Sequence, residues 1–212
     1  YAKLELVYFV NKFDSIRPYK DDEVKSVLSK LCNDSNIVKA FLSLNKTRKL
    51  NYLPFKHFLV TYYLKNKVKN VNSIKEYQDI FEAIVSDVVK TSINNFTVSG
   101  LENIHSDKSY LFISNHRDIT LDSALLNLTL HQNGFKTTNN AVGNNLLEEK
   151  WASDLMRLNK SFIIDRSDKS KKDIYKSLQL ASEFIFNSII NENNSIWIAQ
   201  KQGRSKDGLD YT

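Results

Sequence analysis

The feature that most constrains the fold is an alternation, after residue 95, of short apolar runs with longer segments of helical period. The apolar runs have the length and composition of strands and occupy residues 110–114, 136–142, 161–165 and 195–199, of which 136–142 is the weakest. The helical segments between them occupy residues 123–131, 146–159 and 171–190. Parallel strands need a crossover connection, and a helix usually supplies it. We therefore predict an α/β fold with a mostly parallel sheet covered by helices, in which the first run is a buried strand.

The first 95 residues show helical periodicity instead. Residues 21–32 begin with three acidic side chains, which favour a helix N-terminus, and continue with apolar residues at helical spacing. Residues 74–93 carry one long apolar stripe, so this helix needs a packing partner. Because the pattern changes after Asn95, we predict a helical N-terminal region at residues 1–95 and an α/β domain at residues 96–212.

Positive charge is concentrated in that N-terminal region, which carries the whole formal excess of +6. From Ser35 to Lys75 there is no acidic residue, and the basic side chains alternate with aromatic ones. A basic and aromatic patch suits an anionic membrane surface. RNA would attract the same charges, but the chain has no RNA-binding signature, so no nucleic-acid partner is expected. The alternative is a solvated helical face above core aromatics.

Other features bear on the location of the protein. No apolar run reaches the roughly 18 residues of a membrane-spanning helix, and the start of the chain does not resemble a signal peptide. Cys32 is the only cysteine, so we expect neither an intrachain disulfide nor a cysteine-based zinc site. We therefore expect a cytoplasmic protein, peripherally associated with a membrane. Since the chain begins at Tyr1 and ends in a loop-like stretch, we also expect it to be part of a longer protein.

A polar cluster directly follows each predicted strand. The clusters occupy residues 115–118, 143–145, 165–167 and 200–206. Open α/β sheets bind ligands in the crevice beyond the carboxyl ends of their strands. The repeated placement therefore predicts one ligand site at that edge of the sheet.

Within these clusters, His116 is the candidate general base, because imidazole titrates near neutral pH. Asp118 or Asp122 would supply the carboxylate that fixes its tautomer, although Asp122, directly before the segment 123–131, could instead cap that helix. Arg166 and Arg204 carry planar donors that suit a phosphate, or each could form a surface salt bridge.

Three stretches resemble, in the same order, sequence blocks of one family. They are SNHRDITLD at 114–122, SFIIDRS at 161–167 and QKQGRSKDG at 200–208. The family is that of the phospholipid and glycerol acyltransferases, including glycerol-3-phosphate and lysophosphatidate acyltransferases, and the resemblance covers about residues 98–209.

The chain departs from the family's pattern at three points. Five residues separate His116 from Asp122, where the family usually has four. Lys201 and Gln202 stand where the third block normally carries a glutamate. No proline follows Pro54, so the proline-bearing fourth block is missing, and we expect the domain to be truncated at its C-terminal end or to have diverged there.

The resemblance implies that His116 takes a proton from a substrate hydroxyl while Asp122 orients its ring. The hydroxyl oxygen then attacks an acyl thioester of acyl carrier protein or coenzyme A, with no acyl-enzyme intermediate, no metal and no bound redox cofactor. Arg166 and Arg204 would hold the acceptor's phosphate. The same blocks supply the remaining substrate-binding candidates, which are Asn115, Arg117, Gly203 and Ser205.

We therefore predict an enzyme of phospholipid biosynthesis, an O-acyltransferase that acts on a glycerophosphate, a lysophospholipid or a related polar-lipid acceptor. Two alternatives remain open. The first is a noncatalytic homologue that binds lipid at a membrane surface, which the altered third block favours. The second is a lipid hydrolase in which His116 activates water; a serine hydrolase would show a G-x-S-x-G turn, and the sequence has none.

Overall fold

The structure is a computed structural model that describes residues 12–44, 55–118, 121–167, 170–201 and 203–205. Within these residues, four short parallel strands form one sheet in the order β1-β4-β2-β3. The strands are β1 (Leu111–Ser114), β2 (Asn139–Gly143), β3 (Ser161–Ile164) and β4 (Ile196–Ala199). The predicted α/β class is confirmed.

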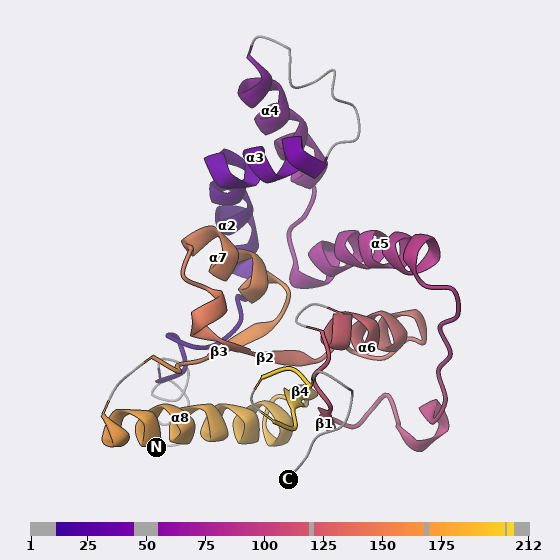
Figure 1. Ribbon diagram of the computed structural model, residues 1–212, viewed down its shortest axis with the longest axis vertical. Helices are drawn as coiled ribbons and strands as arrows, with labels where there is room; N and C mark the ends of the chain where they lie inside the picture. The colour runs from indigo at the N-terminus through magenta and orange to yellow at the C-terminus, as the bar shows by residue number, and fades with distance from the viewer. Residues whose placement is uncertain (1–11, 45–54, 119–120, 168–169, 202, 206–212) are drawn as a thin grey trace.

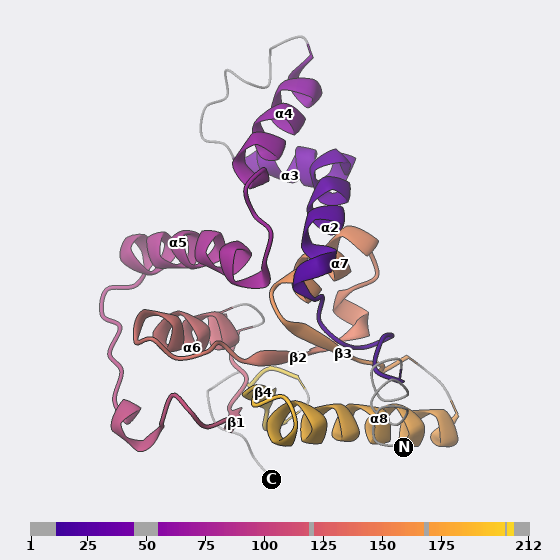
Figure 2. The ribbon, with the colours of Figure 1, turned by 180° about the vertical axis from the view of Figure 1, so that it is seen from behind.

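The helices of the α/β part connect these strands. They are α6 (Leu121–Gln132), α7 (Lys150–Leu158) and α8 (Lys171–Ile190). The steps through α6 and α7 move in one direction across the sheet, whereas the step through α8 returns from β3 to β4. Because parallel crossovers are right-handed, the returning helix must lie on the opposite face. Accordingly, α7 and α8 lie on opposite sides of the strands (Figures 1 and 2).

Two predicted elements start three or more residues later than the sequence pattern indicated. The strand predicted from residue 136 begins at Asn139, because β3 and β4 first offer partners opposite Asn140 and Asn139. The helix predicted from residue 146 begins at Lys150. A short 3-10 turn, η3 (Asn144–Leu146), precedes it, and the non-helical backbone of Leu147 separates the two.

The first strand is not buried, contrary to the prediction. β1 lies at the edge of the sheet and pairs only with β4 among the described residues. Leu111 and Ile113 share one face of the strand and are 44% and 57% exposed. An apolar run therefore identified the strand correctly but not its position, because strand order is not encoded in a single run.

The N-terminal region is helical where it is described. Its helices are α2 (Asp21–Asn33), α3 (Ser35–Leu44), α4 (Lys56–Val68) and α5 (Ile74–Ser92), followed by a short 3-10 turn, η2 (Leu101–Asn103). The start of α5 is fixed by a capping box in which Ser73 Oγ accepts the Glu76 N–H and Glu76 Oε2 accepts the Ser73 N–H. In the described part of the chain, none of the helices has both the length and the apolar character needed to cross a bilayer.

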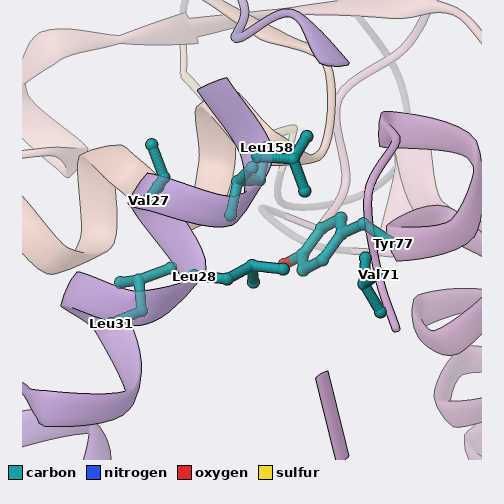
Figure 3. Packing of buried hydrophobic residues seen from close by; sticks show 7 residues of the cluster. Val27, Leu28, Leu31, Val71, Tyr77 and Leu158 are labelled. Carbon is teal, nitrogen blue, oxygen red and sulfur yellow. The ribbon is translucent and has the colours of Figure 1, made fainter. Parts of the chain in front are cut away.

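The N-terminal helices share a core with the α/β part. Val27, Leu28 and Leu31 of α2 pack with Val71, Tyr77 and the fully buried Leu158 of α7 (Figure 3). Beside this cluster, the Tyr19 hydroxyl donates to Asp154 Oδ1 at 2.6 Å. Burying a leucine side chain stabilises a fold by about 1.5–3 kcal/mol, so this contact holds the two parts together.

A second cluster packs α8 against the sheet. It centres on Phe162 of β3, Phe184 of α8 and Ile196 of β4, and it includes Phe13 and Ile16 from the segment before α2. That segment also covers the outer edge of β3, because the Ile163 N–H donates to the Ile16 carbonyl at 2.9 Å. Because all four strands are parallel, their carboxyl ends lie at one edge of the sheet.

Candidate active site

His116 lies two residues beyond the end of β1, at the carboxyl edge of the sheet. Its Nδ1 atom is 2.8 Å from Oδ2 of Asp122, and the two side chains are only 18% and 17% exposed. A carboxylate at Nδ1 favours the tautomer that carries the hydrogen there. The lone pair is then on Nε2, which has no hydrogen-bond partner among the described residues and is the nitrogen able to take a proton from a ligand.

The two aspartates near His116 have different contacts. Asp122 binds the imidazole and also accepts the backbone N–H groups of Arg117 and Asp118, at 2.8 and 3.1 Å from Oδ2. Asp118 Oδ1 instead accepts the N–H of Leu121, at the first turn of α6. Of the two partners that the sequence left open, Asp122 is therefore the one in contact with His116.

The prediction that Asp122 lies directly before the helix is wrong, because α6 begins at Leu121 and Asp122 lies inside its first turn. The backbone N–H groups of Arg117 and Asp118, directly after His116, both donate to the Asp122 carboxylate. A spacing of five residues therefore still brings the side chains of His116 and Asp122 together.

Trp197 of β4 lies next to His116. The centroids of the two rings are 6.2 Å apart in an edge-on arrangement, and the Trp197 indole N–H donates to Ser114 Oγ at 3.0 Å. This side chain limits the movement of the imidazole on the side of the neighbouring strand. Sequence reasoning did not single out Trp197, because only the strand order shows that β4 lies beside β1.

The loop after β4 is tied to the His116 loop by backbone hydrogen bonds. The Gln200 N–H donates to the Ser114 carbonyl at 2.9 Å, and the Ser205 N–H donates to the His116 carbonyl at 2.7 Å. Between them, Gly203 has a φ of +83°, a conformation that glycine adopts without strain. Gln200 and Ser205 of the third block thus bond to the first block, whereas Gln202 and residues 206–208 lie outside the described residues.

The loops after β2 and β3 form a second group of contacts. Asn144 donates from Nδ2 to Asp165 Oδ1 at 2.6 Å and accepts the Arg166 N–H on its own Oδ1 at 2.9 Å. The Arg166 side chain passes close to Gly143, where an added Cβ would lie 3.3 Å from the arginine Cδ. Asn144 therefore positions Arg166; its place directly after a strand was the only signal of this role in the sequence.

Exposed guanidinium groups are distributed along this edge on Arg117, Arg166 and Arg204. Among the described residues, none of the three is paired with a carboxylate. An arginine without an acidic partner keeps its planar set of donors available to an anion. Asn115 is also exposed here, in the loop between β1 and Asp122.

The order of the strands separates the candidate residues into two groups. His116, Arg204 and Ser205 follow the neighbouring strands β1 and β4, whereas Arg166 follows β3, three strand positions from β1. At about 4.8 Å between neighbours, the ends of β1 and β3 lie about 14 Å apart. The described contacts therefore join His116 to the third block and Arg166 to Asn144, but they do not join His116 to Arg166.

Within the described residues there is also no cluster of three or more His, Cys, Asp or Glu side chains that could hold a metal ion. That neither a metal nor a bound redox cofactor is needed stays a prediction from the resemblance.

A comparison with known protein families identifies the class of protein. A scan against protein-family models matches the family described as Acyltransferase over residues 95–208. The fold and the family match define the chain as an acyltransferase. It belongs to the family that contains the phospholipid and glycerol acyltransferases. A search of curated proteins found no match.

Proposed function

We propose that the protein moves a fatty acyl chain from a thioester, carried by acyl carrier protein or coenzyme A, to a hydroxyl of a glycerophosphate, lysophospholipid or related polar lipid. One observation carries the proposal. The His116–Asp122 pair, at 2.8 Å, lies at the edge of the sheet that also bears three guanidinium groups without carboxylate partners among the described residues. A base next to anion-binding groups suits an acceptor that has both a hydroxyl and a phosphate.

In this proposal, Nε2 of His116 takes the proton of the acceptor hydroxyl as its oxygen attacks the thioester carbonyl. The carbon–sulfur bond then breaks, and the departing sulfur receives the proton back from the imidazolium, so the products are an ester and a free thiol. Asp122 stabilises the imidazolium formed between these steps. The imidazole thus serves as base and then as acid, and no acyl-enzyme intermediate is needed.

The acceptor's phosphate would fix the position of its hydroxyl. Arg204 leaves from the strand next to β1, so it is the guanidinium best placed to hold a phosphate while the hydroxyl meets His116. Arg166 would approach the same phosphate from β3, supported by Asn144. Positioning of this kind can supply a large part of a rate enhancement.

The acyl chain needs an apolar surface close to the base. Leu111 and Ile113 supply one, because they are exposed on the edge strand that ends just before His116. Chain length and donor would be selected along this strand.

We also propose that α4 holds the protein at an anionic membrane surface. Phe58, Leu59, Tyr62 and Tyr63 lie at helical spacing and form one exposed stripe, with Phe58 71% and Tyr62 67% exposed. Val60, on the other side of the helix, is buried against α3. The helix has no acidic residue and carries lysines in its last turn. Exposed aromatic side chains together with lysines and no acidic residues favour binding to anionic lipid headgroups. Residues 45–54 of the predicted basic interval lie outside the described residues.

The transfer reaction is tested by mass spectrometry. Wild-type protein and His116→Ala are incubated with acyl-carrier-protein and coenzyme A thioesters and a panel of glycerolipid and aminolipid acceptors. We expect acylated product from the wild type only, with thermal unfolding nearly unchanged in the variant. Equal product from both proteins would refute the role of His116, and no product from a folded wild type would favour the noncatalytic lipid-binding alternative.

The membrane surface is tested by sedimentation with vesicles. The wild type should bind phosphatidylglycerol-containing vesicles more strongly than purely zwitterionic ones, and Phe58→Ser/Tyr62→Ser should lose this binding. Tyr175→Ser is the matched control, because Tyr175 is an equally exposed aromatic residue on α8. Unchanged binding of the double variant would exclude α4 as the docking helix.

A further inference from the structure

A groove of about 920 Å³ lies at the opposite edge of the sheet from His116. It is lined by residues at or just before the starts of three strands, namely Asn139 of β2, Lys160 before β3 and Asn194 before β4. The beginnings of α2 and α5 complete its wall. A four-residue strand spans about 13 Å, so the groove is separate from the candidate active site.

The charged side chains that line this groove are mostly basic. They comprise five cationic side chains and two carboxylates, which are Arg17, Lys20, Lys75, Lys136 and Lys160 with Asp21 and Glu192. Both carboxylates already accept hydrogen bonds, Asp21 from the Ile74 N–H and Glu192 from the side-chain amides of Asn187 and Asn194.

The charge of the lysines is not balanced locally. Arg17 is the only one of these cations that is paired with carboxylates among the described residues, through Asp14 and Glu23. The four lysines are without such a partner there, so an excess of positive charge faces the groove.

Lys160 is the most unusual of these residues. Its side chain is partly buried, and among the described residues its ammonium group donates only to oxygens of Thr137, to the carbonyl at 2.6 Å and to Oγ1 at 3.4 Å. Burial, together with the charge of Lys136, lowers the pKa of Lys160 to about 8. Its φ of +58° is a conformation that costs a lysine about 1 kcal/mol or more. A buried cation beside a second cation is unfavourable unless an anion is drawn to the pair.

We propose that this groove binds a small phosphorylated molecule, whose phosphate is held between Lys136 and Lys160. The volume is within the range of small-molecule sites. Beyond the lysines, the amide side chain of Asn139 can bond the polar body of such a ligand, and Phe135 provides an apolar contact. The site would join the N-terminal region to the α/β part, because both supply its walls.

The test is isothermal titration calorimetry with inorganic pyrophosphate as the probe. It is carried out in the background Arg117→Gln/Arg166→Gln/Arg204→Gln, so that the guanidinium groups at the other edge do not contribute. We expect one binding event, weakened at least tenfold by Lys136→Gln and by Lys160→Met. Lys90→Gln, which removes an exposed lysine at the far end of α5, should bind like the background protein.

Because Lys160→Met removes a hydrogen bond to Thr137, circular dichroism must show that this variant is folded. Lys136→Gln changes an exposed side chain, so the test remains decisive even if Lys160→Met does not fold. Binding that is absent in the background protein, or equally strong in Lys136→Gln and Lys90→Gln, would overturn the proposal. The result does not depend on acyl transfer, since the titration measures binding in a background without the candidate phosphate-binding arginines.

Discussion

The two edges of the sheet gather positive charge in different ways. At the carboxyl edge, the described arginine side chains are exposed, and a part-buried hydrogen bond joins His116 to Asp122. At the amino edge, four of the five cations are lysines, and one of these, Lys160, is partly buried with no carboxylate partner among the described residues. The first arrangement suits the movement of a proton next to an anionic substrate, whereas the second suits the retention of an anion. The difference indicates that one short sheet can support a site at each end.

The edges also differ in what they are built from. The carboxyl edge uses only loops of the α/β part, whereas the amino-edge groove takes one wall from the N-terminal helices. Its integrity therefore depends on the core between α2 and α7.

Leu158→Ala tests this dependence and has the largest expected effect. Leu158 is fully buried between α2, α5 and α7, so its truncation should lower the free energy of unfolding by about 2–5 kcal/mol. Urea denaturation gives the value, and Leu178→Ala, at an exposed position of α8, should change it by less than about 0.5 kcal/mol. A Leu158→Ala variant as stable as the control would show that the N-terminal helices are not held by this core.

Arg204→Gln and Arg166→Gln test whether the carboxyl edge binds the phosphate of the acceptor. A hydrogen bond to a charged group contributes about 1.5–3 kcal/mol, so each variant should raise the KM for glycerol-3-phosphate roughly 10- to 100-fold. Transfer to glycerol, which lacks the phosphate, should change little. Steady-state kinetics with both acceptors makes the comparison, and an equal loss for both would mean that the arginines do not bind the phosphate.

The pH dependence of stability tests the state of Lys160 at the amino edge. Its pKa of about 8 lies below the ordinary value of 10.5, so between these pH values the unfolded chain binds more protons than the folded one. Stability should therefore rise with pH from about 8, by about 1–2 kcal/mol up to pH 9.5, relative to Lys160→Met. Tyr19, whose pKa burial and Asp154 raise to about 12, titrates mainly above this window. Parallel slopes for the two proteins in urea titrations would contradict an uncompensated Lys160.

The sequence predicted the carboxyl edge far better than the amino edge, for a physical reason. Apart from Asp122 in α6 and Trp197 in β4, the candidate residues of the carboxyl edge lie in loops that follow strands, so apolar runs and the polar residues after them indicate where it is. The groove combines Arg17, Lys75, Lys136, Lys160 and Glu192, which no local pattern connects. The order of the strands could not be predicted from the sequence either. This explains the wrong prediction that β1 is buried and the failure to identify Trp197 as a neighbour of His116.

The choice between Asp118 and Asp122 needed the structure because both follow His116 within six residues. The structure shows that Asp118 accepts the N–H of Leu121 at the N-terminus of α6, whereas Asp122 contacts the imidazole of His116.

The most direct test of the central claim is the kcat for acyl transfer of Asp122→Asn, measured beside Asp118→Asn. If Asp122 stabilises the imidazolium of His116, Asp122→Asn should lower kcat at least about 100-fold, the lower end of what general acid–base catalysis supplies. Asp118→Asn should keep most of its kcat and lose about 1 kcal/mol of stability at the start of α6. A wild-type kcat for folded Asp122→Asn would contradict the claim that the His116–Asp122 pair performs the reaction.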